Sequence, residues 1–376
     1  MKIIQFLPDT GVGGGQRFVI DLSNELVKNH QVYIVSMYDS EEFGFFEDLD
    51  ERIKVISLGK KVGFDSSVIF RLFKTIKNIK PDIIHTHLRA FSYLIPLIPF
   101  LRKIKFTFTV HNDAFKECPN PKTRKIRKFI FNKFGVMPIT ISKESTESFK
   151  KAYPNTNYHF IYNGRKKIEK SSDFKNAEAE VQNYKKDEQT LVFINIARME
   201  VQKNQIMLAE TFKRLIKEEN ANALLLIVGG ARPNEKSKNI EAKLIEIQKE
   251  CHQIKLLGDK INATDYLYNS DFFCLSSTYE GMPIVLIEAF DLGIVPICTA
   301  VGGVTEMVTD IDPLLLSKST ETDDFYQLMK SAYNMQKNKR IELSQKAKNL
   351  FSEKYSIEQC TKNHIELYKK LISKTQ

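Results

Sequence analysis

Two glutamates in the second half of the chain have a spacing that suits the binding of hydroxyl groups. Glu280 and Glu288 are separated by seven residues in the segment Glu280-Gly-Met-Pro-Ile-Val-Leu-Ile-Glu288. Pro283 is typical of the first turn of a helix, so we expect Glu280 just ahead of a helix and Glu288 on it. A carboxylate among apolar neighbours needs a partner, and the paired hydroxyls of a sugar are suitable ones. The alternatives are a helix N-terminal carboxylate for Glu280 and an exposed helix position for Glu288.

Two cations lie at a similar place earlier in the chain. Arg198 and Lys203 follow a predicted strand, residues 191–197, and precede a predicted helix. Arginine can bind a phosphate through two parallel hydrogen bonds, whereas lysine acts as a point charge. Beside the free N–H groups of a helix N-terminus, this pair would hold a pyrophosphate. The alternative is a hydrated charged loop.

A glycine cluster, Gly11-Val-Gly-Gly-Gly15, lies between the first predicted strand and a helix. Such glycines let the backbone approach a phosphate at a helix N-terminus. The cluster does not match a dinucleotide fingerprint, because Gln16 stands where that motif requires Gly or Ala, although Asp39 could imitate its ribose-binding acid. A tight strand-to-helix turn and a phosphate or acceptor loop of another kind remain as interpretations.

Histidines at strand ends raise a metal hypothesis. His85 and His87 end a predicted strand, and with His111 and Asp113 they could form a metal cluster. No acidic ligand set recurs at the ends of the later strands, so we expect no metal and interpret these histidines as ordinary strand-end residues. Two acidic pairs of the D-x-D type are interpreted as loop acids: Asp48 with Asp50, and Asp310 with Asp312.

Length and composition indicate a two-domain globular protein. The chain has 376 residues, of which 42% are apolar and 27% charged, and these values exclude global disorder, collagen and coiled coil. This length predicts two domains of nearly equal size. No two of the five cysteines are closer than 23 positions, which argues against a disulfide framework and fits a reducing cytoplasm. Neither a signal peptide nor a membrane span is expected.

The basic excess lies in the first half of the chain. The formal net charge is +10, and residues 1–165 carry 26 Lys+Arg against 16 Asp+Glu. Pro121–Phe134, PKTRKIRKFIFNKF, predicts an amphipathic basic helix that suits an anionic membrane surface. Its expected apolar face contains Ile126, Phe129, Ile130 and Phe134. The alternative is a core helix with a hydrated basic face. No nucleic-acid-binding motif is present, so nucleic acid is not an expected partner.

Short apolar runs alternate with helical periods in both halves, which predicts two α/β, doubly wound parallel sheets. The expected strands are 2–7, 31–37, 53–58, 82–87, 105–111, 137–142, 191–197, 223–229, 254–257, 272–276 and 295–298. The expected domains are 1–168 and 169–355, with the boundary in a charged stretch, 165–188, that has no apolar period. A C-terminal helix within 356–376 is expected to cross back to the first domain. Such sheets bind ligands at the carboxyl ends of their strands, so we expect the site in a cleft between the domains.

The order of these motifs resembles glycosyltransferase family 4, the retaining, nucleotide-sugar-dependent group with the GT-B fold of two facing Rossmann-like domains. The resemblance runs over nearly the whole chain, and its strength lies in the ordered set rather than in any one motif. The matching segments are Gly11–Gly15, Thr109-Val-His-Asn112, Ile139-Thr-Ile-Ser142, Tyr162-Asn-Gly164, Arg198 with Lys203-Asn204, Leu226-Ile-Val-Gly-Gly230, Leu257-Gly-Asp259, Ser276–Phe290 and Gly302-Gly-Val-Thr-Glu306. One departure is Ala197, where the family usually has Gly.

The resemblance implies a role for each matched residue of the second domain. Arg198 and Lys203 would hold the donor diphosphate and neutralise the leaving group. Glu288 would bind the ribose hydroxyls, and Leu257 would lie near the base. Glu280 would hold the donor sugar together with the backbone of four residues that follow it: Gly281, Met282, Pro283 and Ile284.

The resemblance also implies roles for the first domain, which would bind the acceptor. Gly13, Gly14 and Gly15 would close over the phosphates, and His111 would contact the donor sugar near the reacting carbon. His87 would lie near the acceptor cleft. The residues expected to carry catalysis are therefore His111, Glu280, Arg198 and Lys203.

We expect a retaining, metal-independent glycosyltransferase without a cofactor. It would move a sugar from a nucleotide-diphosphate sugar, a UDP-sugar rather than a GDP-sugar, to a glycan or lipid-diphosphate-linked acceptor in bacterial surface polysaccharide synthesis. It would act in the cytoplasm, with residues 121–134 as a contact to the inner face of the plasma membrane. The alternatives are a GT-B-fold epimerase, a non-catalytic nucleotide-sugar-binding protein and, from the tandem sheets alone, an NAD-dependent oxidoreductase.

Overall fold

The structure is a computed structural model that describes residues 1–11, 13–39 and 48–373. The chain divides into two compact units. Unit 1 contains Met1–Lys166 and Lys354–Gln376, and unit 2 contains Lys167–Glu353. The sequence predicts these boundaries after residues 168 and 355.

Unit 1 is built on a parallel sheet with the order β3-β2-β1-β4-β5-β6-β7. Its strands are β1 (Lys2–Leu7), β2 (Gln31–Ser36), β3 (Lys54–Ser57), β4 (Ile83–His87), β5 (Lys105–Val110), β6 (Met137–Thr140) and β7 (His159–Phe160). The strand order reverses between β1 and β4. The carboxyl ends of these two strands therefore form the switch point at which doubly wound sheets bind ligands.

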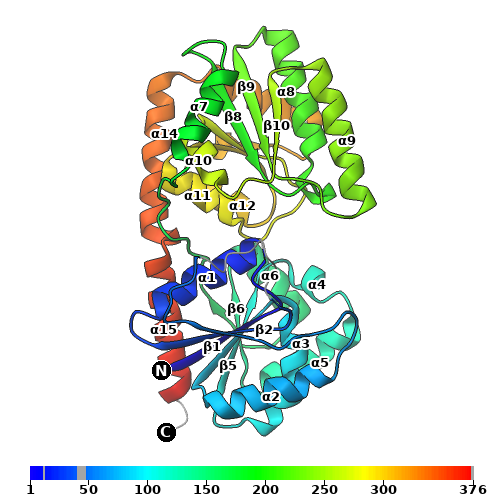
Figure 1. Ribbon diagram of the computed structural model, residues 1–376, viewed down its shortest axis with the longest axis vertical. Helices are drawn as coiled ribbons and strands as arrows, with labels where there is room; N and C mark the ends of the chain where they lie inside the picture. Colours follow the sequence, from blue (N-terminus) through cyan, green and yellow to red (C-terminus); the bar gives the residue numbers. More distant parts are fainter. Residues whose placement is uncertain (12, 40–47, 374–376) are drawn as a thin grey trace. The chain divides into compact units, whose positions relative to one another are not determined.

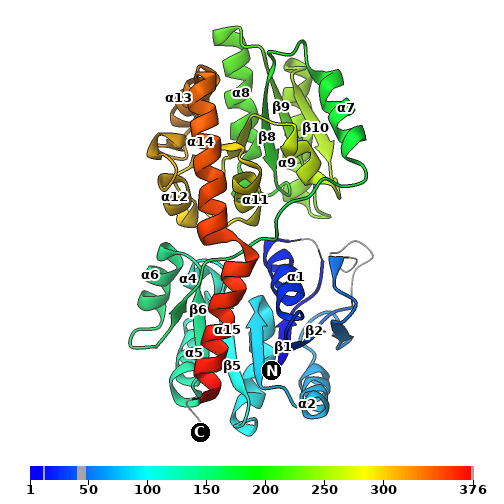
Figure 2. The same ribbon diagram turned by 90° about the vertical axis from the view of Figure 1, so that its left-hand side faces the viewer.

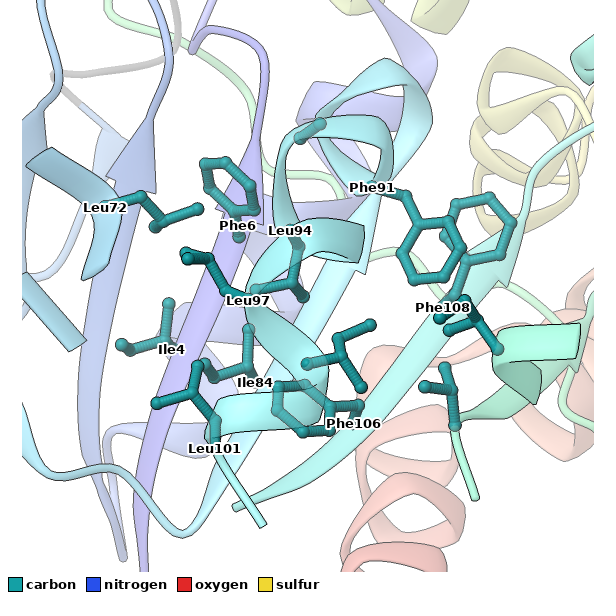
Figure 3. Close-up of a cluster of buried hydrophobic side chains, with 14 of the residues drawn as sticks. Ile4, Phe6, Leu72, Ile84, Phe91, Leu94, Leu97, Leu101, Phe106 and Phe108 are labelled. Atoms are coloured by element: carbon teal, nitrogen blue, oxygen red, sulfur yellow. The ribbon is translucent and has the colours of Figure 1, made fainter. Parts of the chain in front are cut away.

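One face of this sheet is apolar and is covered by helices that follow β3, β4 and β5. They are α2 (Ser67–Ile79), η2 (Leu88–Ala90), α3 (Phe91–Leu94), η3 (Ile95–Phe100) and α5 (Pro121–Phe134). Ile4 and Phe6 of β1 point into the cluster that these helices close, beside Ile84, Leu94 and Leu97 (Figure 3). Side chains alternate along a strand, so Gln5, between Ile4 and Phe6, faces the other way.

The opposite face is covered by α1 (Gly14–Leu26) and by the C-terminal helix α15 (Ile357–Ser373), which lie side by side (Figure 2). The strand residues beneath them are polar and fully buried, among them Gln5, His85, His87 and Thr109. Directly before α15, Ser356 forms a β-bridge with Arg165 of unit 1. The remaining helices of unit 1 are α4 (Ala114–Glu117) and α6 (Lys143–Ala152).

Unit 2 repeats the arrangement with the strand order β10-β9-β8-β11-β12-β13, again with parallel neighbours (Figure 1). Its strands are β8 (Leu191–Ile196), β9 (Ala223–Val228), β10 (Ile254–Gly258), β11 (Phe272–Leu275), β12 (Val295–Thr299) and β13 (Leu316–Ser317). Its helices are α7 (Phe174–Tyr184), η4 (Val201–Lys203), α8 (Gln205–Glu219), α9 (Glu235–Glu250), α10 (Ala263–Tyr268), α11 (Ile284–Leu292), α12 (Gly302–Thr309), η5 (Pro313–Leu315), α13 (Thr322–Tyr333) and α14 (Lys337–Leu350), and the π-turn η6 (Phe351–Tyr355) leads on to α15. The two doubly wound parallel sheets predicted from the sequence are confirmed.

Three helices depart from the expectation. α7 lies inside the stretch 165–188, for which no apolar period was expected; it buries only Phe174, Ala177 and Val181, at positions i, i+3 and i+7. The apolar period of the first helix predicts its start at Phe18, but α1 begins four residues earlier, at Gly14, because its first turn is made of glycine and polar residues. Pro283 is not in the first turn of α11 but precedes it, in an extended conformation.

Among the described residues, no helix combines the length and the apolar character that crossing a membrane requires.

Candidate functional site

The best-defined polar cluster of unit 2 joins Lys203 to Glu280. The Lys203 Nζ atom lies 2.7 Å from Glu280 Oε1, and the same carboxylate oxygen accepts a hydrogen bond of 2.6 Å from the Ser277 hydroxyl. The Glu280 side chain is 8% exposed and that of Lys203 is 20% exposed. A largely buried, charge-assisted contact of this kind has a fixed geometry. The structure thus brings together two of the four residues expected to carry catalysis.

The loops that carry these two side chains are joined by several hydrogen bonds. Thr278 N donates to Gln202 O over 2.8 Å, and Gln202 Nε2 donates to Tyr279 O over 2.7 Å. Ser276 Oγ donates to Lys203 O over 2.8 Å. These bonds follow from the sheet topology, because β8 and β11 are neighbours and their carboxyl ends lie at the same edge. The site is therefore held by backbone contacts and not only by the ion pair.

Arg198 lies at the same edge but points toward solvent. Its side chain is 45% exposed, and its Nη2 atom lies 3.3 Å from Glu200 Oε1. Gln205, which is buried, donates to the carbonyls of Ala197 and Arg198 and so fixes the backbone that carries the guanidinium. An exposed arginine on a fixed backbone is able to turn toward an anion at the end of β8.

Gly229 allows the ends of β8 and β9 to come close together. Its φ angle is +124°, and a Cβ atom there would lie 2.1 Å from the carbonyl oxygen of Ala197. Only glycine fits such an approach of backbone to backbone. The Gly229 N–H donates to Gly258 O over 2.7 Å, which adds the end of β10 to the same edge. Leu257, half-buried, lies at that end.

The four residues after Glu280 connect this edge of the sheet to α11. Gly281, Met282, Pro283 and Ile284 are all buried. Gly281 O accepts from Gly303 N over 2.9 Å, which ties the segment to α12. The α11 helix begins directly after it and carries Glu288, which is half-buried. The amides at the start of a helix attract an anion, so this segment suits a phosphate or a sugar oxygen.

The site residues predicted in unit 1 lie at the carboxyl ends of β1 and β5, which have β4 between them. Gly13, Gly14 and Gly15 follow β1 and lead into α1, and His111 directly follows β5. Gly11 N donates to Asp9 Oδ1 over 3.0 Å, and Gln16 Nε2 donates to the same oxygen over 3.1 Å. The Asp9 carboxylate therefore connects the two ends of the glycine loop. Leu88 packs at the Cβ position of Gly15. This confirms a strand-to-helix turn; Val12 lies outside the described residues.

The rings of His87 and Phe18 lie against His111. His87 Nδ1 lies 3.1 Å from His111 Nε2, and the ring of Phe18 from α1 packs edge-on against both imidazoles. Burial lowers the pKa of His111 to about 4, so the ring is neutral at physiological pH. Glu117 is the last residue of the following helix, α4, and burial raises the pKa of its carboxyl to about 7. Arg127 and the backbone N–H groups of His111 and Asn112 act in the opposite direction and favour the ionised form. Burial thus disfavours the charged form both of His111 and of the Glu117 carboxyl next to its loop.

The residues considered as metal ligands make other contacts. His85 bonds the hydroxyls of Tyr368 and Thr109, each over 2.7 Å. Asp50 binds Arg52 over 2.7 Å, and Asp312 accepts from Leu314 N over 3.0 Å. Asp48 contacts Arg17. Within the ranges described, no group of three or more His, Cys, Asp or Glu side chains could hold a metal ion.

The basic helix α5 is oriented differently from the expectation. Ile130 and Phe131 are buried, but so is Arg127, whose guanidinium lies 5.5 Å and 5.2 Å from the ring centroids of Phe91 and Phe108. The expected apolar face is therefore split: Ile126 and Phe129 are 52% and 58% exposed. Cation–π contacts with two rings explain how a charged side chain replaces an apolar one inside.

Several residues of these sites were not found from the sequence. Ser277 lies within a matched motif, but nothing in its type indicated that it would bond Glu280. Gln5 and Tyr368 gave no signal, because a single polar residue in a strand or helix is common. Asp21 accepts from Arg165 Nη1 over 2.6 Å in the buried interior of unit 1. Its partner is 144 positions away, so no local pattern could reveal the pair.

Two family profiles match successive parts of the chain. "Glycosyl transferases group 1" matches residues 176–350, and "Glycosyltransferase Family 4" matches residues 12–166. The capsular polysaccharide biosynthesis glycosyltransferase CapH of Staphylococcus aureus is 30% identical over 231 residues, which is 58% of this chain and 60% of CapH. The UDP-Gal:alpha-D-GlcNAc-diphosphoundecaprenol alpha-1,3-galactosyltransferase of Escherichia coli is 25% identical over 317 residues, 80% of each chain.

The fold has close structural neighbours. HepE of Anabaena, in a crystal structure with UDP, superimposes with a TM-score of 0.79 over 98% of this chain and 100% of its own, at 17% identity. The chain spans less than two thirds of the length of the first curated relatives that it matches, 58% and 60%. The two profiles lie on the two units in chain order. The chain belongs to the family 4 (group 1) glycosyltransferases and has the GT-B fold, as the sequence predicted.

Proposed function

We propose that this protein is a retaining, metal-independent glycosyltransferase that takes a sugar from a nucleotide-diphosphate sugar. Unit 2 would hold the donor, and unit 1 would supply the acceptor side. The acceptor would be a glycan or a lipid-diphosphate-linked saccharide of a bacterial surface polysaccharide. CapH and the galactosyltransferase of Escherichia coli support this class of product by what their names state of those proteins. The latter uses a UDP-sugar, which favours UDP over GDP here.

The observation that carries the proposal is the Lys203–Glu280 contact at the carboxyl edge of the second sheet. It places a cation and a hydrogen-bond-accepting carboxylate 2.7 Å apart, beside the start of α11. A sugar attached to a diphosphate presents hydroxyls and negative charge side by side. A site with a carboxylate and a cation in contact complements both parts of such a ligand.

The chemistry needs charge separation. As the bond between the anomeric carbon and the phosphate oxygen breaks, positive charge develops on the sugar ring and negative charge on the leaving diphosphate. Lys203, Arg198 and the amides at the start of α11 would stabilise the diphosphate. The Glu280 carboxylate would hold hydroxyls of the sugar, and Glu288 those of the ribose. Fixed cations would do in this site what a divalent ion does in other transferases.

Ligand-induced thermal stabilisation tests the donor assignment. The protein is unfolded by heat with UDP-, GDP- and ADP-sugars and with NAD, each at saturation. We expect a rise with one UDP-sugar, because a ligand at 100 times its Kd adds about 2.7 kcal/mol to the free energy of unfolding. Arg198→Ala and Glu288→Ala should lose the rise, whereas Lys243→Ala, on the exposed side of α9, should keep it.

Two further measurements test the reaction. Transfer to a lipid-diphosphate-linked saccharide should persist in EDTA, and the product should keep the anomeric configuration of the donor by NMR. An epimerase would convert the nucleotide sugar without acceptor. Stabilisation by NAD alone, or by no nucleotide sugar, would contradict the proposal.

We also propose that unit 1 docks on an anionic membrane surface, where a lipid-linked acceptor would reside. The elements α2, η3 and α5 cover one face of the sheet, and none contains an Asp or Glu. Their exposed side chains include Phe70 at 71%, Phe100 at 73% and Phe129 at 58%. Exposed lysines flank these rings: Lys74, Lys77, Lys122, Lys125 and Lys133. Aromatic rings among lysines suit the interface of an anionic bilayer.

Vesicle co-sedimentation tests the docking. The protein should bind phosphatidylcholine vesicles only when they contain phosphatidylglycerol. Lys125→Glu with Lys133→Glu should weaken binding at least about tenfold, since each cation near the surface contributes about 1 kcal/mol. Lys236→Glu with Lys238→Glu, which makes the same charge change on α9 of unit 2, should have a much smaller effect. Equal losses in both double variants would leave only net charge as the cause and reject a docking face.

A further inference from the structure

A line of three buried or half-buried polar side chains crosses the sheet of unit 1 toward His111. Gln5 of β1 and His87 at the end of β4 are both fully buried, beneath α1 and α15. Strands β1, β4 and β5 are neighbours, and His87 is in register with Thr109, two residues before His111. In the strand register Gln5 lies opposite His85 and His87 lies opposite Thr109, so Gln5, His87 and His111 form a diagonal across the three strands, on one face of the sheet.

Two hydrogen bonds connect the row. His87 Nε2 lies 2.8 Å from Gln5 Oε1, and His87 Nδ1 lies 3.1 Å from His111 Nε2. A carbonyl oxygen can only accept, so Nε2 of His87 carries the proton. In a neutral imidazole the other nitrogen is then an acceptor, so His87 Nδ1 must receive the N–H of His111 Nε2.

This sequence of donors and acceptors determines the tautomer of His111. With its proton on Nε2, a neutral His111 has its lone pair on Nδ1. That atom has no hydrogen-bond partner within the part of the chain that the structure describes, and the residue is only half-buried. Nδ1 is therefore available to accept a hydrogen bond from a bound molecule.

The surroundings keep both rings neutral. The ring of His85 from β4 lies 4.1 Å from that of His87 between centroids, and His364 from α15 acts electrostatically on both rings. Tyr368 from α15 contacts His85, and Glu117 lies next to the His111 backbone. Phe18 from α1 contributes only an apolar ring. Burial lowers the pKa of His87, with the His111 ring as a further cause, and burial lowers that of His111 as well. A second proton on either ring would leave two donors facing each other.

We propose that Gln5 and His87 are positioning residues that hold His111 in its Nε2-protonated tautomer, with Nδ1 as the acceptor for a hydroxyl group of the bound sugar. The tautomer follows from the hydrogen bonds between two neutral rings and needs no ligand; its use for a sugar hydroxyl rests on the proposed function. Gln5 and His87 act only through His111.

Nitrogen-15 NMR of histidine-labelled protein tests the tautomer without any ligand. At pH 7 the His111 signals should show a protonated Nε2 and an unprotonated Nδ1, as should those of His87 with its proton on Nε2. In Gln5→Leu, which removes the acceptor, both rings should lose this preference. Gln5→Met also removes the acceptor but keeps the length of the side chain, so it should have the same effect and remains informative if Gln5→Leu does not fold. A wild-type His111 with its proton on Nδ1 would overturn the proposal.

Kinetics test the role. Gln5→Leu and His87→Phe should raise the KM for the donor and lower kcat/KM at least about tenfold, because the His111 ring is present but its Nδ1 no longer accepts the sugar hydroxyl. His85→Phe is the matched control, since His85 is equally buried in the same layer but bonds Tyr368 and Thr109 and makes no hydrogen bond to His111. If His85→Phe changes both constants as much, the effect is structural and the proposal fails. If no donor is turned over at all, the proposed function fails, while the NMR result still decides the tautomer.

Discussion

At the scale of single residues, the charges of Lys203 and Glu280 can serve either the stability of unit 2 or the chemistry of the site. The carboxylate is 8% exposed and is bonded by the ammonium at 2.7 Å and by the Ser277 hydroxyl at 2.6 Å. A buried ion pair contributes little net stability, but removing one partner leaves the other charge without compensation. This asymmetry supports the proposal that the pair is a preorganised binding site.

This gives a prediction for the cation. Lys203→Met keeps the length of the side chain and removes its charge, so kcat/KM should fall about 100-fold or more, in the range for loss of one group that stabilises a developing anion. Lys213→Met is the control, because Lys213 lies on α8 of the same unit and contacts Glu210 and Glu250 at 2.6 and 3.0 Å. Steady-state kinetics with a fixed acceptor measure both. Equal losses in the two variants would assign the effect to unit stability.

At the scale of elements, the C-terminal helix α15 is an integral part of unit 1 although it follows unit 2 in the chain. It packs against α1 and contributes Tyr368, whose hydroxyl lies 2.7 Å from His85 Nδ1, 283 positions away. Its first turn runs over Gly164, where a Cβ atom would lie 2.6 Å from Cys360 Cβ and 2.8 Å from Ser356 O. The helix can dock here only because this position has no side chain.

Gly164→Ala should therefore loosen α15 from the sheet. Because the clash involves backbone atoms that cannot turn away, we expect a loss of about 2 to 3 kcal/mol in the free energy of unfolding, as for an overpacked core. Hydrogen exchange should increase in α15 and in the strand ends beneath it. Peptides of α9, in unit 2, serve as the internal control and should exchange as in the wild type. Unchanged exchange in α15 would mean that the backbone relaxes without cost.

The elements also show what the sequence could and could not predict. Apolar runs with β-branched residues predicted eleven of the strands, and the helix Pro121–Phe134 was predicted with both bounds. The two-residue strands β7 and β13 were not predicted, because two residues give no pattern. The α7 helix was missed because three buried residues among many charged ones give no visible period. In the sites, residue types pointed to Lys203 and Glu280 separately. Their contact, over 77 positions, comes from the pairing of β8 with β11, which no local pattern encodes.

At the scale of the whole molecule, the histidines are divided unequally between the units. Unit 1 contains six of the seven, and unit 2 contains only the exposed His252. Burial lowers the pKa of all six: His30, His85, His87, His111, His159 and His364. For His111 and His364 the pKa falls to about 4. Acid therefore acts on the two units differently.

The sign of the effect follows from proton uptake. Above pH 6.5, the ordinary pKa, these histidines are neutral in both folded and unfolded states, so their burial costs nothing further. Below it the unfolded chain binds protons that folded unit 1 does not, and stability falls by about 1.4 kcal/mol per pH unit for each such histidine. The loss continues down to pH 4, where His111 and His364 are protonated in the folded state as well.

We therefore expect unit 1 to unfold before unit 2 as the pH falls from 7 toward 5. Pulsed hydrogen exchange read by mass spectrometry should show lost protection in the peptides of β1, β4, β5 and α15, while those of β8, β9 and α8 stay protected. Carboxylates act in both units, so they cannot produce this difference by themselves. His364→Gln, which removes one titrating ring at the α15 interface, should reduce the pH slope of unit 1 by about 1.4 kcal/mol per pH unit. Simultaneous unfolding of both units with an unchanged slope in that variant would show that the buried histidines do not control acid stability.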